Sequence, residues 1–183
     1  MKALFDYNRY VTRSSKPGAR RQFHLVMIKP SHYDDNGYVI QWIRSAIPSN
    51  TLAALNGLAE DCARREVLGD DVDLMLTTSD ETNTRVRPDR IIKLVHDSGG
   101  LGMVALVGVQ TNQFPHAMDL ARPMRAAGIQ VAIGGFHVSG CISMLPKLPR
   151  ISRKRRTWAS ACSPAKRKAV GWTRCCRMPP QAR

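Results

Sequence analysis

Short apolar runs alternate with amphipathic segments through most of this chain. Residues 24–28, 72–77, 104–109 and 131–133 form apolar runs that predict four buried strands. Between them, apolar residues at helical spacing predict helices over 50–68, from Pro88 to the pair Gly99–Gly100, and from about 117 until Gly128 ends the segment. Right-handed crossovers between such strands predict a parallel sheet in the order 2-1-3-4, with helices on both faces. We therefore expect an α/β fold, a doubly wound Rossmann-like or flavodoxin-like sheet.

Composition divides the chain into three parts. Residues 1–22 form a polar, basic lead, residues 23–149 carry the alternating pattern, and residues 150–183 form a basic tail. The net charge of +14 is uneven, because residues 1–150 hold 18 Lys and Arg against 14 Asp and Glu, whereas residues 151–183 hold 10 basic residues and no acid. We expect the α/β domain to end near Pro149.

A shifted reading frame would account for the basic tail. The segment ISRKRRTWASACSPAKRKA can be re-read in a shifted frame as Leu-Lys-Glu-Ala-Gln-Asp-Met-Gly-Ile-Ser-Leu-Phe-Ala-Gly-Glu-Ala-Glu-Gly, an acidic helix followed by a strand. We favour this frameshift, which predicts a sheet that is incomplete at its C-terminal edge. The alternative is a genuine disordered tail whose RKRR and KRK clusters bind polyanions without specificity. Nucleic-acid binding would rest entirely on that tail.

Composition also indicates the compartment. No stretch is long and apolar enough for a membrane span, and the N-terminus lacks the apolar core of a signal peptide, so we expect a soluble, cytoplasmic protein. The cysteines are not spaced as C-x-x-C or C-x-x-x-C-x-x-C, which predicts no zinc site and no iron–sulfur cluster in this chain. They are Cys62, Cys141, Cys162, Cys175 and Cys176.

The loops that follow the predicted strands are the candidate ligand site, because ligands of parallel sheets bind beyond the carboxyl ends of the strands. The neutral side chains after residue 109 suit a ligand rich in amides, and the pair Gly134–Gly135 would let backbone approach a bulky cofactor. Asp80 and Glu81 could hold a ligand or act as acid and base, although a solvated loop explains them better. Residues 29–48 form a long connection that we expect to overhang the strand ends, with a turn at 34–37 and a short helix around Trp42.

Two segments carry a resemblance to a known family. The order of helix, ARPMRAAG, apolar strand and GGFHVSG, together with IPSNTLAALNGLAE at 47–60, resembles the cobalamin-binding domain that precedes the catalytic barrel in many radical S-adenosylmethionine enzymes. The resemblance implies a corrinoid bound over the strand ends. The residues it implies at the cofactor are Pro30, Ser31, Gly108, Val109, Gln110, Thr111, Gly134, Gly135, Phe136 and His137.

His32 is the candidate cobalt ligand. Cobalamin domains of the methionine synthase type carry Asp-x-His-x-x-Gly after the first strand, and His32 stands at a comparable place in Pro30–Ser31–His32–Tyr33–Asp34. The flanking Asp and Gly are missing, and a carboxylate is what normally fixes the tautomer of a ligand imidazole. We therefore expect a partly exposed loop histidine rather than a lower ligand.

The sequence thus favours a cobalamin-binding module whose radical S-adenosylmethionine barrel is absent from this chain, so no activity is expected from it alone. The alternative is a flavodoxin-like or receiver-like regulatory domain that binds another small ligand. A receiver needs acidic residues at the ends of its first and third strands, whereas these strands end in Lys29–Pro30 and Val109–Gln110.

Overall fold

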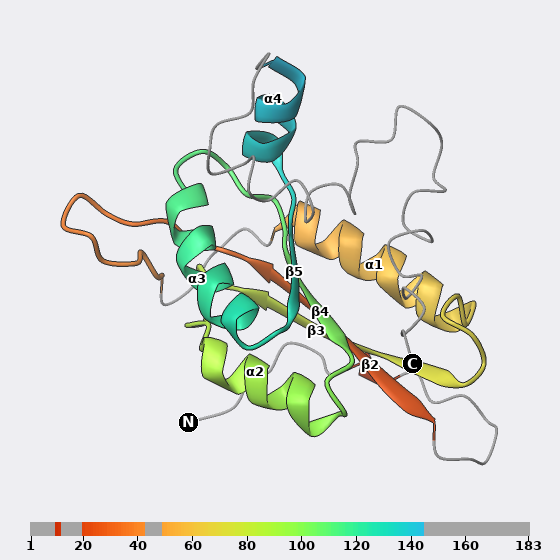
Figure 1. The fold of residues 1–183 in the computed structure, drawn as a ribbon. Coiled ribbons are helices and arrows are strands. Elements are labelled where there is room, and N and C mark those ends of the chain that lie inside the picture. The colour runs from red at the N-terminus through yellow and green to blue at the C-terminus, as the bar shows by residue number, and fades with distance from the viewer. Residues whose placement is uncertain (1–9, 12–19, 43–48, 145–183) are drawn as a thin grey trace.

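The computed structural model describes residues 10–11, 20–42 and 49–144. Within these residues five strands form one sheet in the order β1-β3-β2-β4-β5 (Figure 1). The strands are β1 (Tyr10–Val11), β2 (Arg21–Lys29), β3 (Val72–Asp80), β4 (Gly102–Leu106) and β5 (Gln130–Ile133).

Strands β2 to β5 are parallel, and their order confirms the prediction of 2-1-3-4. The register pairs Leu25 of β2 with Leu76 of β3 on one side and with Met103 of β4 on the other. The additional strand β1 was not predicted, because two residues are too few to show an alternating pattern. It pairs antiparallel with β3, with Tyr10 opposite Leu76.

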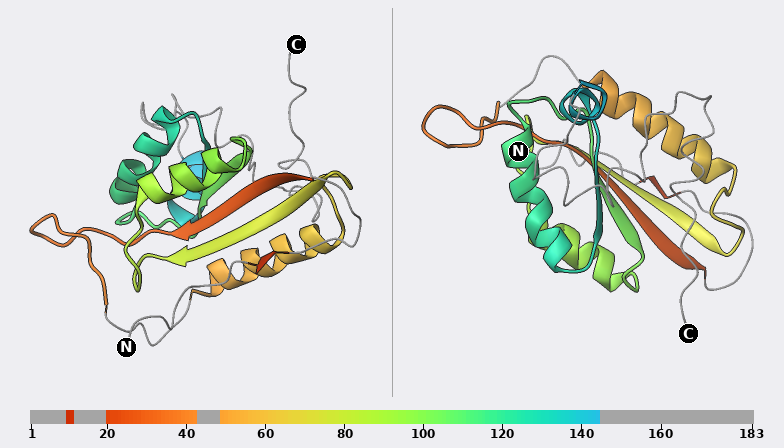
Figure 2. Two further views of the ribbon diagram at one scale, coloured as in Figure 1. Left: turned by 90° about the horizontal axis from the view of Figure 1, so that it is seen from below. Right: turned by 45° about the horizontal axis from the view of Figure 1, so that its top comes forward.

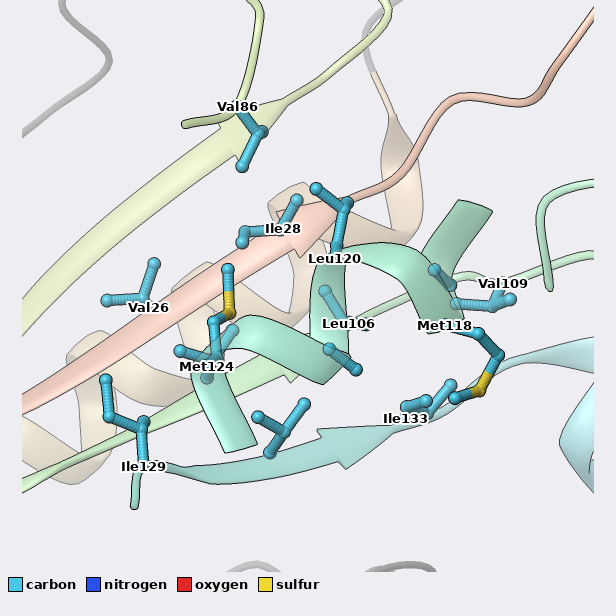
Figure 3. Close-up of a cluster of buried hydrophobic side chains, with 14 of the residues drawn as sticks. Val26, Ile28, Val86, Leu106, Val109, Met118, Leu120, Met124, Ile129 and Ile133 are labelled. Atoms are coloured by element: carbon cyan, nitrogen blue, oxygen red, sulfur yellow. The ribbon is translucent and has the colours of Figure 1, made fainter. Parts of the chain in front are cut away.

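Helices cover both faces of the sheet (Figure 2). Helix α1 (Asn50–Arg64) lies on one face, and α2 (Pro88–Asp97) and α3 (Phe114–Ala126) lie on the other. Successive side chains of a strand point to opposite faces. Accordingly, Leu25 and Met27 of β2 join the apolar cluster beneath α1, whereas Val26 and Ile28 join the cluster beneath α2 and α3 (Figure 3). This division confirms the doubly wound α/β fold.

A fourth helix, α4 (Phe136–Met144), begins within the loop that the sequence predicts after the strand at 131–133. The expectation of a loop was wrong because FHVSGCISM lacks the apolar stripe and the opposite polar face from which a helix is predicted. The helix begins directly after Gly135, and none of its residues is fully buried. Consequently Phe136, Ile142 and Met144 are exposed large hydrophobic side chains, with exposed fractions of 78%, 37% and 81%.

Within the described residues, β5 pairs only with β4 and forms one edge of the sheet. The basic tail and the frameshift that we inferred for it lie outside the described residues. In the part of the chain that the structure describes, no helix has both the length and the apolarity needed to cross a membrane.

Candidate functional site

The candidate site lies at the carboxyl ends of β2, β4 and β5. The chain leaves β2 towards α1 on one face of the sheet and leaves β4 towards α3 on the other face. Because β2 and β4 are neighbours, this reversal makes their carboxyl ends the topological switch point of the sheet. The fold therefore brings the predicted loops after β2, β4 and β5 to the edge where ligands of such sheets bind.

The loop after β2 is held by the protein itself. Pro30 and Ser31 are buried, with Ser31 1% exposed. The Ser31 backbone N–H donates to Oε2 of Glu81 at 3.1 Å, and its hydroxyl donates to the Ile40 carbonyl. The N–H and the hydroxyl hydrogen of Ser31 are thus already donated to protein acceptors, and the buried Pro30 and Ser31 side chains belong to the protein interior.

Residues 33–39 form a hairpin rather than a loose connection. Tyr33 and Val39 make an antiparallel bridge, and the Asp34 carboxylate accepts the N–H groups of Asn36 and Tyr38. This confirms the turn predicted at 34–37. The hairpin extends away from the sheet (Figures 1 and 2). The short helix expected around Trp42 is not formed at residues 41–42, and residues 43–48 lie outside the described part.

The loops after β4 and β5 interlock through their backbones. The Val109 N–H donates to the Gly134 carbonyl at 3.0 Å, and the His137 N–H donates to the Val109 carbonyl at 3.1 Å. Gly135 has a φ of +142°, and a Cβ there would lie 2.2 Å from the Val109 nitrogen. Glycine is therefore required at 135 by neighbouring protein backbone. Val109 is fully buried, and its side chain belongs to the core (Figure 3).

Gly134 has a different surrounding from Gly135. A Cβ at 134 would meet no atom within 4 Å, so this stretch of backbone borders open space. Gln110, Thr111 and Phe136 are exposed, and His137 is half-buried. Gly108 is partly exposed beside the first turn of α1, where a Cβ would lie 3.5 Å from the Thr51 methyl carbon. The exposed part of the predicted site is therefore neutral, with hydrogen-bonding side chains and one aromatic ring.

The acidic residues after β3 are not a solvated loop, so that prediction was wrong. Glu81 is 2% exposed, and its Oε2 accepts from Nε2 of His116 at 2.8 Å as well as from Ser31. Asp80 lies 3.6 Å from the Lys29 ammonium and also accepts from Thr82. Both carboxylates therefore have protein partners.

An aromatic residue completes the surroundings of His116. The rings of Tyr33 and His116 meet edge to face, with centroids 4.9 Å apart, and the Tyr33 hydroxyl donates to Asp119 at 2.8 Å. Burial, followed by the hydrogen bond and the charge of Asp119, raises the pKa of Tyr33 to about 12. Sequence reasoning missed His116, because a histidine in the first turn of a helix carries no signal that its partner is 35 residues away.

His32 is partly exposed, as expected. Its carbonyl accepts from the Ile40 N–H at 2.9 Å, but we find no hydrogen bond to its imidazole within the described residues. Over residues 20–42 and 49–144, no group of three or more His, Cys, Asp or Glu side chains is placed to hold a metal ion. Among the described residues, no carboxylate is hydrogen-bonded to the His32 imidazole to orient it as a ligand.

We compared the chain with protein-family models, with curated proteins and with solved structures, and none of the three comparisons found a match.

Proposed function

We propose that the exposed face around Gly134 binds a corrinoid and that this domain is the cobalamin-binding module of a radical S-adenosylmethionine enzyme. The observation that carries the proposal is the open backbone at Gly134, bordered by exposed neutral side chains at a topological switch point. A corrin ring is fringed with amides, which need donors and acceptors rather than charge. The sequence resemblance to the cobalamin-binding family supports the same ligand.

Different residues of this chain would make different contacts with the corrinoid. Gln110 and Thr111 would hydrogen-bond the amide fringe, the backbone at Gly134 would permit close approach, and the exposed ring of Phe136 would cover part of the corrin. Ser31 and Glu81 would keep the surrounding loops in place from below. When bound, the corrinoid supplies methyl transfer or assists radical chemistry, which belongs to the cofactor. The iron–sulfur cluster and S-adenosylmethionine cleavage belong, in this proposal, to a partner barrel.

A regulatory domain with another flat ligand is the second candidate. The sheet order agrees with flavodoxin-like folds, in which a flavin binds at the switch point between the first and third strands. A receiver-like domain is less well supported, since Asp80 is paired with Lys29 and Glu81 is buried against His116. Binding of polyanions by residues 151–183 stays a prediction from composition.

The test is titration of the full chain with hydroxocobalamin, followed by the visible spectrum and by retention of the corrinoid through gel filtration. We expect saturable binding that is weakened at least about tenfold by Gly134→Trp, because the indole would fill the open space beside the backbone. Gly57→Trp is the matched control, because Gly57 also faces open space but lies in the middle of α1. We expect it to bind like the wild type.

Two outcomes would refute the proposal. One is absence of binding by a folded protein, and the other is equal binding by the Gly134→Trp and Gly57→Trp variants. Flavin mononucleotide is titrated in parallel. Retention of the flavin without retention of the corrinoid would establish the second candidate instead.

A further inference from the structure

A cysteine, a histidine and a threonine meet beside the candidate site. Cys141 and His137 lie one turn apart on α4, and Sγ of Cys141 is 3.8 Å from Nε2 of His137. On the other side of the imidazole, Nδ1 lies 3.3 Å from the Thr111 hydroxyl oxygen, which comes from the loop after β4. The three side chains thus form a continuous series of contacts between two segments of the chain.

The imidazole is positioned by its neighbours. Its ring packs against Phe114 at the start of α3, with ring centroids 4.2 Å apart. When Nδ1–H donates to Thr111, the lone pair of Nε2 faces the Cys141 thiol and can accept its proton. A nucleophile, a base within reach and a third group that orients the base are the arrangement of an activated thiol.

The other described cysteine has the opposite surroundings. Cys62 is 8% exposed in the core beneath α1, and burial raises the pKa of its thiol. A protonated, inaccessible thiol is a poor nucleophile. Cys141 is only half-buried and has an imidazole at hand. The same molecule therefore contains an internal reference for an unreactive cysteine.

We propose that Cys141 is a nucleophilic thiol that takes a low-molecular-weight disulfide, and that His137 is its base. The thiol proton passes to Nε2 of His137, and the thiolate attacks one sulfur of the disulfide. The disulfide's S–S bond breaks as the Cys141 S–S bond forms, and the departing thiolate recovers the proton from the imidazolium. Cys141 is oxidised and the small disulfide is reduced. This proposal does not depend on corrinoid binding.

Alkylation of the full chain by iodoacetamide, measured for each cysteine by peptide mass spectrometry, tests the role of His137. We expect Cys141 to react much faster than Cys62 and to slow about tenfold in His137→Phe, which keeps a ring against Phe114 but removes both nitrogens. Thr111→Val keeps the shape of Thr111 and removes only the hydroxyl, so a smaller decrease is expected. Unchanged Cys141 rates in both variants would overturn the proposal.

The labelling of Cys62 reports whether each variant is folded, because that thiol becomes accessible only when the core opens. If His137→Phe exposes Cys62, Thr111→Val decides the question. Incubation with glutathione disulfide tests the electrophile. We expect a glutathione adduct on Cys141 that forms before any adduct on Cys62 and is removed by dithiothreitol. If alkylation of Cys141 depends on His137 but no glutathione adduct forms, the proposal that Cys141 reacts with a small disulfide is overturned.

Discussion

The Glu81 carboxylate and the His116 imidazole form a buried pair, with Oε2 of Glu81 2.8 Å from Nε2 of His116. Glu81 follows β3, whereas His116 lies in the first turn of α3. The same oxygen accepts the Ser31 N–H after β2, at 3.1 Å. One carboxylate therefore joins three elements beneath the candidate site. Hydrogen bonds to a buried charged group are stronger than neutral ones, and they are costly to leave unmade.

Glu81→Ala is expected to lower the free energy of unfolding by about 3 kcal/mol, because it leaves two buried donors without an acceptor. Glu81→Gln keeps an oxygen that can accept from both donors, so a loss of only about 1 kcal/mol is expected. Urea denaturation at neutral pH measures both. Asp35→Ala removes an exposed carboxylate and serves as the control, with a change below about 0.5 kcal/mol. Equal effects of Glu81→Ala and Asp35→Ala would contradict the role of the pair.

Tyr33 is expected to titrate later than an ordinary tyrosine. Burial and Asp119 raise its pKa to about 12 in the folded protein, whereas an unfolded tyrosine titrates near about 10. The folded state thus holds this proton more tightly. Its contribution to stability is complete below the unfolded pKa and is lost as the pH rises through the folded one.

Ultraviolet titration of tyrosinate checks this expectation. The last ionising tyrosine of the wild type should be missing from Tyr33→Phe. Asp119→Asn, which removes the charge beside the phenol, should move that ionisation to lower pH. If the wild type and Tyr33→Phe instead differ only by the signal of one tyrosine that ionises near the ordinary pKa, the pKa of Tyr33 is not raised.

The two neighbouring glycines are expected to differ sharply. Gly135→Ala places a Cβ against the Val109 backbone in a strained conformation and should destabilise the protein by about 3 kcal/mol or more. Gly134→Ala places a Cβ in open space and should change stability by less than about 1 kcal/mol. Thermal and urea unfolding compare the two. A Gly135→Ala variant as stable as Gly134→Ala would mean that the interlocked loops rearrange freely.

Much of the fold could be predicted because it depends on local pattern. Apolar runs such as 24–28, which lies within β2, predict strands, although the run 104–109 extends beyond β4, which ends at Leu106. Crossover handedness then restricts the order of the sheet. The strand β1 and the helix α4 could not be predicted in this way. The first has two residues, and the second follows from the backbone turn at Gly135 rather than from its own apolar period.

The candidate site was only partly predictable. The sequence indicated which loops would meet, because carboxyl ends of parallel strands share one edge. It could not indicate that Ser31 is buried, or that the Glu81 carboxylate is bonded to His116, since these depend on contacts between residues far apart in the chain. The sequence likewise could not show that a Cβ would have free space at Gly134 but would clash with protein backbone at Gly135, because this difference depends on how the loops pack.

His32→Ala is expected to leave hydroxocobalamin affinity within about twofold of the wild type, as for a surface substitution. Its imidazole is partly exposed and is not oriented by a carboxylate among the described residues. Both the His32→Ala and the Gly134→Trp variants are titrated with hydroxocobalamin. The first reports whether His32 ligates cobalt, and the second reports whether the corrin ring binds beside Gly134. Loss of affinity in a folded His32→Ala protein would make this histidine the lower ligand.

Self-association is expected to increase with salt. The chain carries a net charge of +14, so its molecules repel one another. Within the described residues, the exposed apolar side chains of α4 and the unpaired edge of β5 favour association instead. Salt screens the repulsion, since the Debye length falls from about 10 Å at 0.1 M to about 3 Å at 1 M. Light scattering should therefore show a rising mean mass over that range.

The apolar surface of α4 is the expected contact in this association. Met144→Ser should reduce the rise in mass, because Met144 is 81% exposed, whereas Leu58→Ser on α1 removes a side chain that is 53% exposed on the opposite face from α3 and should have less effect. Both substitutions leave the net charge unchanged, so a difference between them reflects location rather than repulsion. A wild-type protein that stays a monodisperse monomer at high salt would show that α4 and the β5 edge are not adhesive surfaces.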